Sequence, residues 1–354
     1  MEPSHVLQTL GVALGLASLS GLNLYLTVFV TGLAIQQHWI DVSQSYPELA
    51  VLAHPAILAI AGVLYVLQFF ADKVPWVDSL WDAVHTFIRP IGGAFLALRA
   101  LGTLDPAVEV IAALLAGSAT LVVHSMKAGT RLVVNHSPEP FSNIALSIGE
   151  DAAVIGGLFL IKHDPVLALV VFTLLLTAIG YLGPKVFRAA KVQLWLLWKK
   201  IGSPASDHLQ TQLSKDLPHE LDIAFHTVNF ERDPIAWSVS CISTSARGLP
   251  GNLFGFLVAT TRPGPKLAFV ARRGWNHAAA ELDLTSYKVA HEPKFLSENV
   301  VLYSLEKKPK YIFLFARSQR LVVQAVVASI VERLAMHSHT PAAKPLMEEP
   351  AISS

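Results

Sequence analysis

The chain contains a single cysteine, Cys241, and few charged residues, which make up 15% of its 354 residues. One cysteine cannot build an internal disulfide framework, so packing has to hold the fold together. No residues typical of a reactive thiol surround Cys241, and we therefore expect it to be a small buried side chain.

Motifs of the common catalytic chemistries are also missing. The sequence has no His-x-x-x-His pair, no paired cysteines, no glycine-rich phosphate loop and no serine nucleophile motif. We therefore predict no metal and no cofactor, and an enzyme is less expected than a non-catalytic protein. The net charge of +1 does not favour nucleic acid as a partner.

Apolar residues, in contrast, are abundant. They make up 53% of the chain, and the mean hydropathy is +0.48, which is typical of membrane proteins. A bilayer span needs about 20 apolar residues. The sequence predicts six spans, at residues 6–35, 50–70, 84–102, 106–124, 142–161 and 165–187.

Three of these stretches are irregular. The first is too long for one straight span, so it either breaks near Gly21 to Asn23 or tilts. Arg89-Pro90 and Glu150-Asp151 fall inside the third and fifth stretches. Either of these is a candidate for a broken or re-entrant helix, which is tolerated only where protein or water covers the backbone.

Basic residues predict the orientation. Cytoplasmic loops are enriched in Lys and Arg, and five such residues follow the last stretch, at positions 185, 188, 191, 199 and 200. This exit is therefore expected to be cytoplasmic, and counting back through six spans puts the N-terminus in the cytoplasm as well. The sequence thus predicts a multi-pass plasma-membrane protein with both termini inside.

The motif Ile-Gly-Gly-x-Phe-Leu occurs twice, at residues 91–96 and 155–160. Repeats are typical of transporters, whose sites lie at repeat interfaces. The alternative is that glycine pairs simply let membrane helices approach closely.

Beyond residue 200 the composition becomes polar and β-rich. We predict a membrane domain at 1–200, a linker at 201–218, a soluble domain at 219–340 and a disordered tail at 341–354. An amphipathic helix is expected at 319–336. Together these features predict a small antiparallel barrel or sandwich with a C-terminal helix. Its strands are expected at 222–230, 236–245, 253–261, 266–273, 279–290, 299–305 and 310–316.

Ionisable residues in or beside membrane spans are costly and are therefore functional candidates. Several recur at spacings of three and four, which places them on one helix face. We expect them to meet at a common depth near the cytoplasmic surface. The predicted substrate-binding residues are Asp72, Lys73, Asp78, His85, Arg89, His124, Lys127, Arg131, Glu150 and Asp151.

Structural explanations compete with this binding site. Lys73, Lys127 and Arg131 are also expected as determinants of orientation. A structural ion pair would join Arg89 or Lys127 to Glu150 or Asp151. In the soluble part, basic turns at 272–275 and 307–310 either contact anionic lipid or are ordinary solvated loops.

Two pairs of motifs carry a family resemblance. Residues 70–75 with 86–93, and residues 124–131 with 147–151, resemble an uncharacterised family of bacterial integral membrane proteins, the domain-of-unknown-function family DUF4126. The resemblance covers residues 8–190 and implies a multi-span domain of the bacterial inner membrane without an assigned activity. Residues 251–260 and 266–270 are similar to the β3–β4 hairpin of pleckstrin-homology-like (PH-like) domains.

These observations lead to three functional hypotheses. The first is a transporter-like protein whose cytoplasm-facing polar cavity binds a small polar or anionic solute or a lipid head group, with Glu150 and Asp151 carrying a coupling proton or cation. The second is a membrane-embedded enzyme that acts on lipid-linked phosphate through His85 or His124. The third is a non-catalytic scaffold with a cytoplasmic recruitment domain. Membrane lipids are expected partners, and a homo-oligomer is an open alternative.

Overall fold

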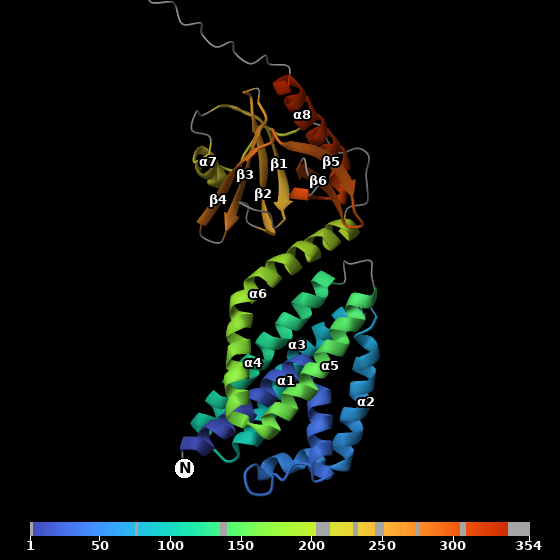
Figure 1. The fold of residues 1–354 in the computed structure, drawn as a ribbon, viewed down its shortest axis with the longest axis vertical. Helices are drawn as coiled ribbons and strands as arrows, with labels where there is room; N and C mark the ends of the chain where they lie inside the picture. Colours follow the sequence, from blue (N-terminus) through green and yellow to red (C-terminus); the bar gives the residue numbers. More distant parts are fainter. Residues whose placement is uncertain are drawn as a thin grey trace, which may run out of the picture. The chain divides into compact units, whose positions relative to one another are not determined.

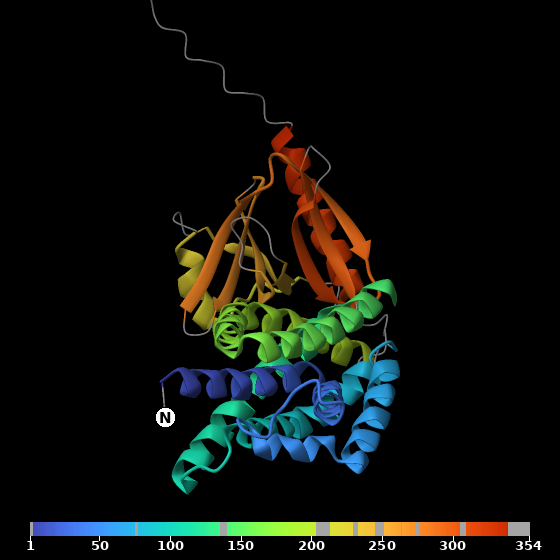
Figure 2. The same ribbon diagram turned by 60° about the horizontal axis from the view of Figure 1, so that its bottom comes forward.

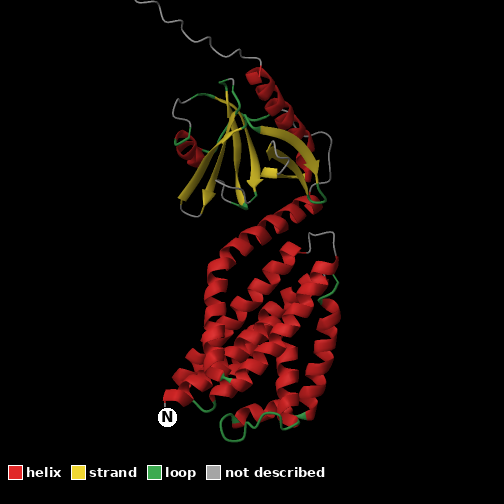
Figure 3. Cartoon of the chain, viewed as in Figure 1, coloured by secondary structure: helices red, strands yellow, loops and turns green. Residues whose placement is uncertain are grey.

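The computed structural model describes residues 3–74, 77–134, 140–202, 213–228, 233–244, 251–262, 264–273, 276–304 and 309–338. The chain divides into two compact units, residues 1–193 and 194–354. The first is helical and the second is built around a β-sheet (Figure 3). Residues 203–212 of the predicted linker and the whole predicted tail lie outside the described residues, so the predicted domain boundaries stay predictions.

The helical unit contains six α-helices and a short 3₁₀-helix in the described chain (Figure 1). All of them begin with a proline except α3, as favoured at the first helical position. The elements are α1 (Pro3–Gln36), η1 (Pro47–Ala53), α2 (Pro55–Ala71), α3 (Val77–Leu101), α4 (Pro106–Val134), α5 (Pro140–His163) and α6 (Pro165–Gly202), the last of which continues past the unit boundary.

Not all of these helices qualify as membrane spans. By length and composition α1, α4, α5 and α6 are long and apolar enough, and the bent pair of η1 and α2 gives up to five spans. The charged helix α3 is not among them. The membrane character is therefore supported, whereas the six predicted spans are not confirmed.

Of the three stretches predicted to be irregular, the one that is interrupted is α1. Asn23 has non-helical torsions (φ −150°, ψ 96°), and Figures 1 and 2 show α1 bent into two arms. In contrast, α3 and α5 run without a break through Pro90 and through Glu150-Asp151. The first stretch therefore breaks, and the third and fifth are regular helices.

Both ends of α1 lie at the same end of the helical unit. A Cβ on Gly11 in the first arm would collide with the carbonyl oxygen of Pro165, and one on Gly32 in the second arm would collide with that of Leu52. Side chains from both arms line one cavity together with Pro165. Asn23 is thus the apex of a V whose two arms open toward η1 and the start of α6.

The Gly-Gly motifs pack around this bent helix. α1 contacts α2, α3, α4 and α5. Gly92 of α3 faces Leu24 in the second arm, and Gly157 of α5 faces Leu19 in the first arm. Close helix packing therefore accounts for both motifs. The predicted duplication is not tested by this contact.

Replacement of Gly93 by alanine should destabilise the helical unit. The new Cβ would collide with the side chain of Thr120, which is fully buried and donates to the carbonyl oxygen of Ala17 at 2.8 Å. Overpacking of this kind costs about 1–3 kcal/mol, and it should lower the unfolding temperature of the full chain in detergent. Gly156→Ala, where the Cβ meets open space, is the control and should not lower it. Equal melting of both variants would contradict the packing at Thr120.

The second unit contains a seven-stranded antiparallel sheet. After α7 (His219–His226) come β1 (Ile235–Ser243), β2 (Leu253–Thr260), β3 (Lys266–Arg273), β4 (Asn276–Asp283), β5 (Tyr287–Pro293), β6 (Ser297–Ser304), β7 (Pro309–Ala316), η2 (Arg317–Gln319) and α8 (Arg320–Ser338). The strand order is β4-β3-β2-β1-β7-β6-β5. This sheet is open, so the predicted barrel or sandwich is corrected, while the strand count and the C-terminal helix are confirmed.

Two predicted strands were wrong. The stretch 222–230 lies partly in helix α7, where Leu221, Ala224 and Phe225 share one buried face, a helical spacing that the sequence analysis read as β. The stretch 279–290 is divided between β4 and β5 by a turn in which Asp283 accepts from the backbone of Thr285. The predicted hairpin at residues 251–260 and 266–270 is formed by β2 and β3, and its likeness to PH-like domains stays a prediction.

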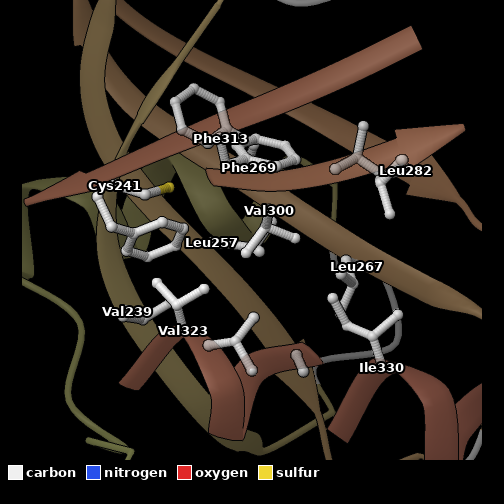
Figure 4. Packing of buried hydrophobic residues seen from close by; sticks show 14 of the residues in the cluster. Val239, Cys241, Leu257, Leu267, Phe269, Leu282, Val300, Phe313, Val323 and Ile330 are labelled. Atoms are coloured by element: carbon white, nitrogen blue, oxygen red, sulfur yellow. The ribbon is translucent and has the colours of Figure 1, made fainter. Parts of the chain in front are cut away.

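The alternation of side chains along the strands gives the sheet two apolar faces. Phe269 and Leu257 lie in the core that α8 covers with Val323 and Ile330 (Figure 4). The intervening residues Val258 and Val270 pack against α7. Cys241 is buried in the first of these cores, as predicted, and burial raises the pKa of its thiol.

Candidate functional site

The predicted site residues gather around the apex of α1. They come from the end of α2, the first half of α3, the second half of α4 and the middle of α5. Nine of the ten are at most 9% exposed, and Lys73 is the partly exposed one. The buried nine are Asp72, Asp78, His85, Arg89, His124, Lys127, Arg131, Glu150 and Asp151.

Arg131 and Lys127 are at the centre of one ion-pair network. Arg131 Nη2 donates to Glu150 Oε2 at 2.5 Å and lies 3.4 Å from Asp72 Oδ2, and its Nη1 lies 3.6 Å from Asp78 Oδ2. Lys127 Nζ lies 3.1 Å from Glu150 Oε2 and 3.3 Å from Asp72 Oδ2. Two cations therefore hold three buried carboxylates from three different segments of the chain.

Arg89 is at the centre of a second group. Its Nη2 lies 3.3 Å from Asp82 Oδ1, and its Nη1 lies 2.7 Å from His124 Nδ1. Because arginine only donates, Nδ1 of His124 is the acceptor and carries no proton. Nε2 of His124 then holds the proton and donates to the backbone oxygen of Asp82 at 3.1 Å. Both ring nitrogens of His124 are thus engaged within the protein.

The same cations satisfy the broken backbone of α1. Arg89 donates to the carbonyl oxygen of Gly21 at 3.2 Å, and Lys127 donates to that of Leu22 at 2.9 Å. The side-chain oxygen of Asn23 accepts from the backbone N–H of Leu26 at 3.1 Å, as a helix N-cap does. An interrupted helix at membrane depth needs such partners for its backbone.

Asp151 differs from the other carboxylates because its partners are neutral. Its Oδ1 accepts from Asn23 Nδ2 at 2.9 Å, and its Oδ2 accepts from the hydroxyl of Tyr65 at 3.2 Å. These are the hydrogen bonds that its carboxylate accepts in the described chain, and Lys73 interacts with it electrostatically without forming an ion pair. Asp151 therefore lies at the apex of α1 without a cation in direct contact.

The buried charges of the helical unit do not balance. Among the described residues, five buried carboxylates face three buried cations, which leaves an excess of two negative charges when His85 and His124 are neutral. The carboxylates are Asp72, Asp78, Asp82, Glu150 and Asp151, and the cations are Arg89, Lys127 and Arg131. An acidic excess of this kind at membrane depth favours binding of a proton or a cation.

Four predicted residues, Lys73, His85, His124 and Asp151, form no ion pair among the described residues. Lys73 folds back on α2, where its Nζ donates to the carbonyl oxygen of Phe69 at 3.1 Å and lies over that residue's ring. His85 donates from Nδ1 to the carbonyl oxygen of Trp81 at 2.7 Å and lies 2.8 Å from the hydroxyl of Tyr25.

The predicted structural ion pair is present between Lys127 and Glu150 at 3.1 Å. Arg89 pairs with Asp82 instead. The site also contains Asn23, Tyr65 and Asp82, which were not among the predicted residues. Asp82 was recognisable, since positions 78, 82, 85 and 89 follow a helical spacing. The described residues include no group of three or more His, Cys, Asp or Glu able to hold a metal.

The predicted basic turns of the second unit are only partly described. Trp275 and residues 307–308 lie outside the described residues, as do the side chains of Arg273 and Lys310. Arg272 pairs with Glu220 at 3.0 Å on the surface. Lipid contact by these turns therefore stays a prediction.

The helical unit matches a known protein family. Residues 10–185 match the model of the family described as "Domain of unknown function (DUF4126)". Residues 10–185 form a DUF4126 domain. The family predicted from the motifs is thereby confirmed, and the helices and motifs described above belong to this domain, whereas the β-sheet unit lies outside it.

Other comparisons add little. No curated protein matches the chain. A solved structure described as Vav1 inhibited by an allosteric inhibitor matches with 11% identity and a TM-score of 0.23. That match covers 90% of this chain and 53% of the other, so the chain spans about half of that protein's length. A TM-score this low carries no argument about fold or function.

Arg131→Ala should strongly destabilise the DUF4126 domain. It removes the cation shared by Asp72, Asp78 and Glu150, and removal of one partner of a buried pair costs about 3–5 kcal/mol. The unfolding temperature of the full chain in detergent measures this loss. The control is Arg99→Ala, whose pair with Glu48 is partly exposed and is worth about 0–1 kcal/mol. Similar losses in both variants would show that the buried network does not stabilise the domain.

Proposed function

We propose that this chain is a transporter-like membrane protein that binds a small polar or anionic solute, or a lipid head group, at the apex of α1. The observation that carries the proposal is the excess of buried carboxylates over buried cations, together with Asp151, whose hydrogen-bond partners beside the broken helix are neutral. Interrupted helices with ionisable groups at membrane depth are typical of transporter binding sites.

We assign separate roles to the charged groups. Arg131 and Lys127 are the groups able to hold an anionic ligand, which would compete with Glu150 for them. A bound anion would add negative charge to a site that already has an excess of carboxylates. A proton or cation bound to Asp151 would therefore favour binding of the anion. Glu150, which the sequence analysis paired with Asp151 as a coupling group, belongs to the ion-pair network instead. Asp151 is therefore the proposed coupling residue.

Asp151→Asn should uncouple transport while leaving the fold intact, because asparagine keeps the size of the side chain but cannot be charged. Proteoliposomes would be assayed for entry of labelled inorganic phosphate and for scrambling of fluorescent phosphatidylglycerol under an imposed pH gradient. We expect the gradient-dependent rate to fall at least tenfold. Glu109→Gln, on the exposed face of α4, should keep the full rate.

The combined variant Glu150→Gln with Asp151→Asn gives the decisive outcome. Transport or scrambling at the full rate in this variant would rule out the proposed mechanism.

A scaffold is the second candidate, because the cations contact carboxylates directly and both partners are buried. Such pairs are sufficient to hold a structure without any ligand. This hypothesis expects the Asp151→Asn protein to keep its function and a chain lacking residues 205–340 to lose it. The enzyme hypothesis is less supported, because His124 and His85 both use their two ring nitrogens in internal contacts.

For the second unit we propose a cytoplasmic regulatory or lipid-contacting role. Its seven strands and C-terminal helix support a PH-like domain. We place the protein in the bacterial inner membrane with α6 leaving on the cytoplasmic side. Val186 lies beside Gly129 near the end of α4, so this part of α6 is at the same end of the unit as Asp72 and Arg131. Lys185 and Arg188 flank Val186, and such basic residues are enriched on the cytoplasmic side.

The bent α1 supports a second proposal, on the position of the N-terminus. The sequence-based topology counted α1 as a span and put both termini inside. Both ends of α1 lie near Pro165 and Leu52, and α2 then runs about 25 Å, at 1.5 Å per residue, before it reaches Asp72. With a cytoplasmic α6 exit, a re-entrant α1 places the N-terminus on the opposite side.

A cysteine introduced by Ser4→Cys, in a Cys241→Ser background, should therefore react with an impermeant maleimide added outside intact spheroplasts. Lys185→Cys in the same background should react only after permeabilisation. Both residues are exposed in the helical unit. Protection of residue 4 in intact spheroplasts would show that α1 crosses the membrane.

A further inference from the structure

The two arms of α1 enclose a cavity at the end of the helical unit that is opposite to the ion-pair network. The cavity has a volume of about 200 Å³. Val12 and Leu16 line it from the first arm, Ala34 and Ile35 from the second, and the loop after α1 and the end of α5 complete the wall. The space exists because α1 bends at Asn23, so that residues on both sides of the bend face each other.

The wall of this cavity is mainly apolar, although Asp41, Ser45 and Lys162 also line it. Leu16, Ala34 and Leu49 are 2%, 7% and 3% exposed, yet they border open space. A buried apolar cavity of about 150 Å³ is large enough to bind benzene. The cavity between the arms therefore has room for an apolar group of about six to eight carbons by the same comparison.

One polar group in the wall has no partner. Thr31 lines the cavity and is 7% exposed, and its Oγ1 makes no hydrogen bond in the described chain. A threonine on a helix ordinarily bonds to a backbone carbonyl one turn back, as Thr27 bonds to Asn23 at 2.8 Å. A buried hydroxyl without a partner is unfavourable, and a ligand with a hydrogen-bonding group would satisfy it.

We propose that this cavity is a binding site for a medium-chain amphiphile, an alkyl body of about six to eight carbons with a hydroxyl that pairs with Thr31. The apolar wall binds the body through the area removed from water, and Thr31 selects a ligand with a hydroxyl over a plain hydrocarbon. The site uses none of the residues of the proposed transport site, so either can fail without the other.

The test uses the full chain in lipid nanodiscs and a photoactivatable diazirine analogue of 1-octanol as the probe. Labelled peptides are mapped by mass spectrometry. We expect saturable labelling of the cavity wall, for example at Tyr46, that an excess of n-octanol abolishes. Ala34→Phe fills the cavity and should reduce this labelling at least tenfold. Val63→Phe adds the same ring on the exposed face of α2 and should leave the labelling unchanged.

Thr31→Val keeps the shape of the side chain, and it is the variant to test if Ala34→Phe does not fold. It should reduce labelling by the octanol analogue about tenfold and leave labelling by the matching octane analogue unchanged. Equal loss of both probes, or labelling that does not saturate, would overturn the proposal. Labelling of the same wall by a phospholipid with a diazirine in its acyl chain, without competition by octanol, would also overturn it, since a bilayer lipid tail would then occupy the cavity.

Discussion

A broken helix inside a membrane has to find partners for its released backbone groups, and the rest of the helical unit is arranged around this requirement. At the apex of α1 the partners are Arg89 and Lys127, which bind the carbonyl oxygens of Gly21 and Leu22, and Asn23, which caps the second arm. Cations at this depth need carboxylates in turn. The charge network on α2, α3, α4 and α5 thus follows from a single interruption in α1.

This arrangement connects stability with function. The groups that would bind an anionic solute are the groups that hold the apex, since Lys127 contacts Leu22, Asp72 and Glu150 at once. A ligand that competes for Lys127 therefore weakens the contact that fixes the bend. Such a ligand would have different affinities for the bent conformation of α1 and for other conformations. A difference in affinity of this kind is what allows a ligand to shift the populations of two conformations.

Much of the site was predictable from local spacing, whereas the backbone around it was not. Arg89 and Lys127 lie on helices whose polar residues recur every three or four positions, so the sequence indicates their faces directly. Whether α1 tilts or breaks depends on Arg89 and Lys127, which are far away in the chain. The open sheet was missed for a similar reason, whereas the helix in 222–230 has a local signal in the spacing of Leu221, Ala224 and Phe225. In the described chain the ladder between β1 and β7 is short, with Ile242 opposite Leu314 and Ser243 opposite Phe313, and no local pattern shows where such a long-range pairing stops.

The composition of α3 has a consequence for how the protein is made. The helix contains Asp78, Asp82, Arg89 and Arg99, and a charge at a helix centre opposes insertion by about 2.5–3.5 kcal/mol. Among the described ion pairs, Arg89–Asp82 is internal to α3, whereas Asp78 pairs with Arg131 of α4, which is synthesised later. Insertion of α3 into a bilayer is therefore unfavourable until α4 supplies Arg131 as a partner for Asp78.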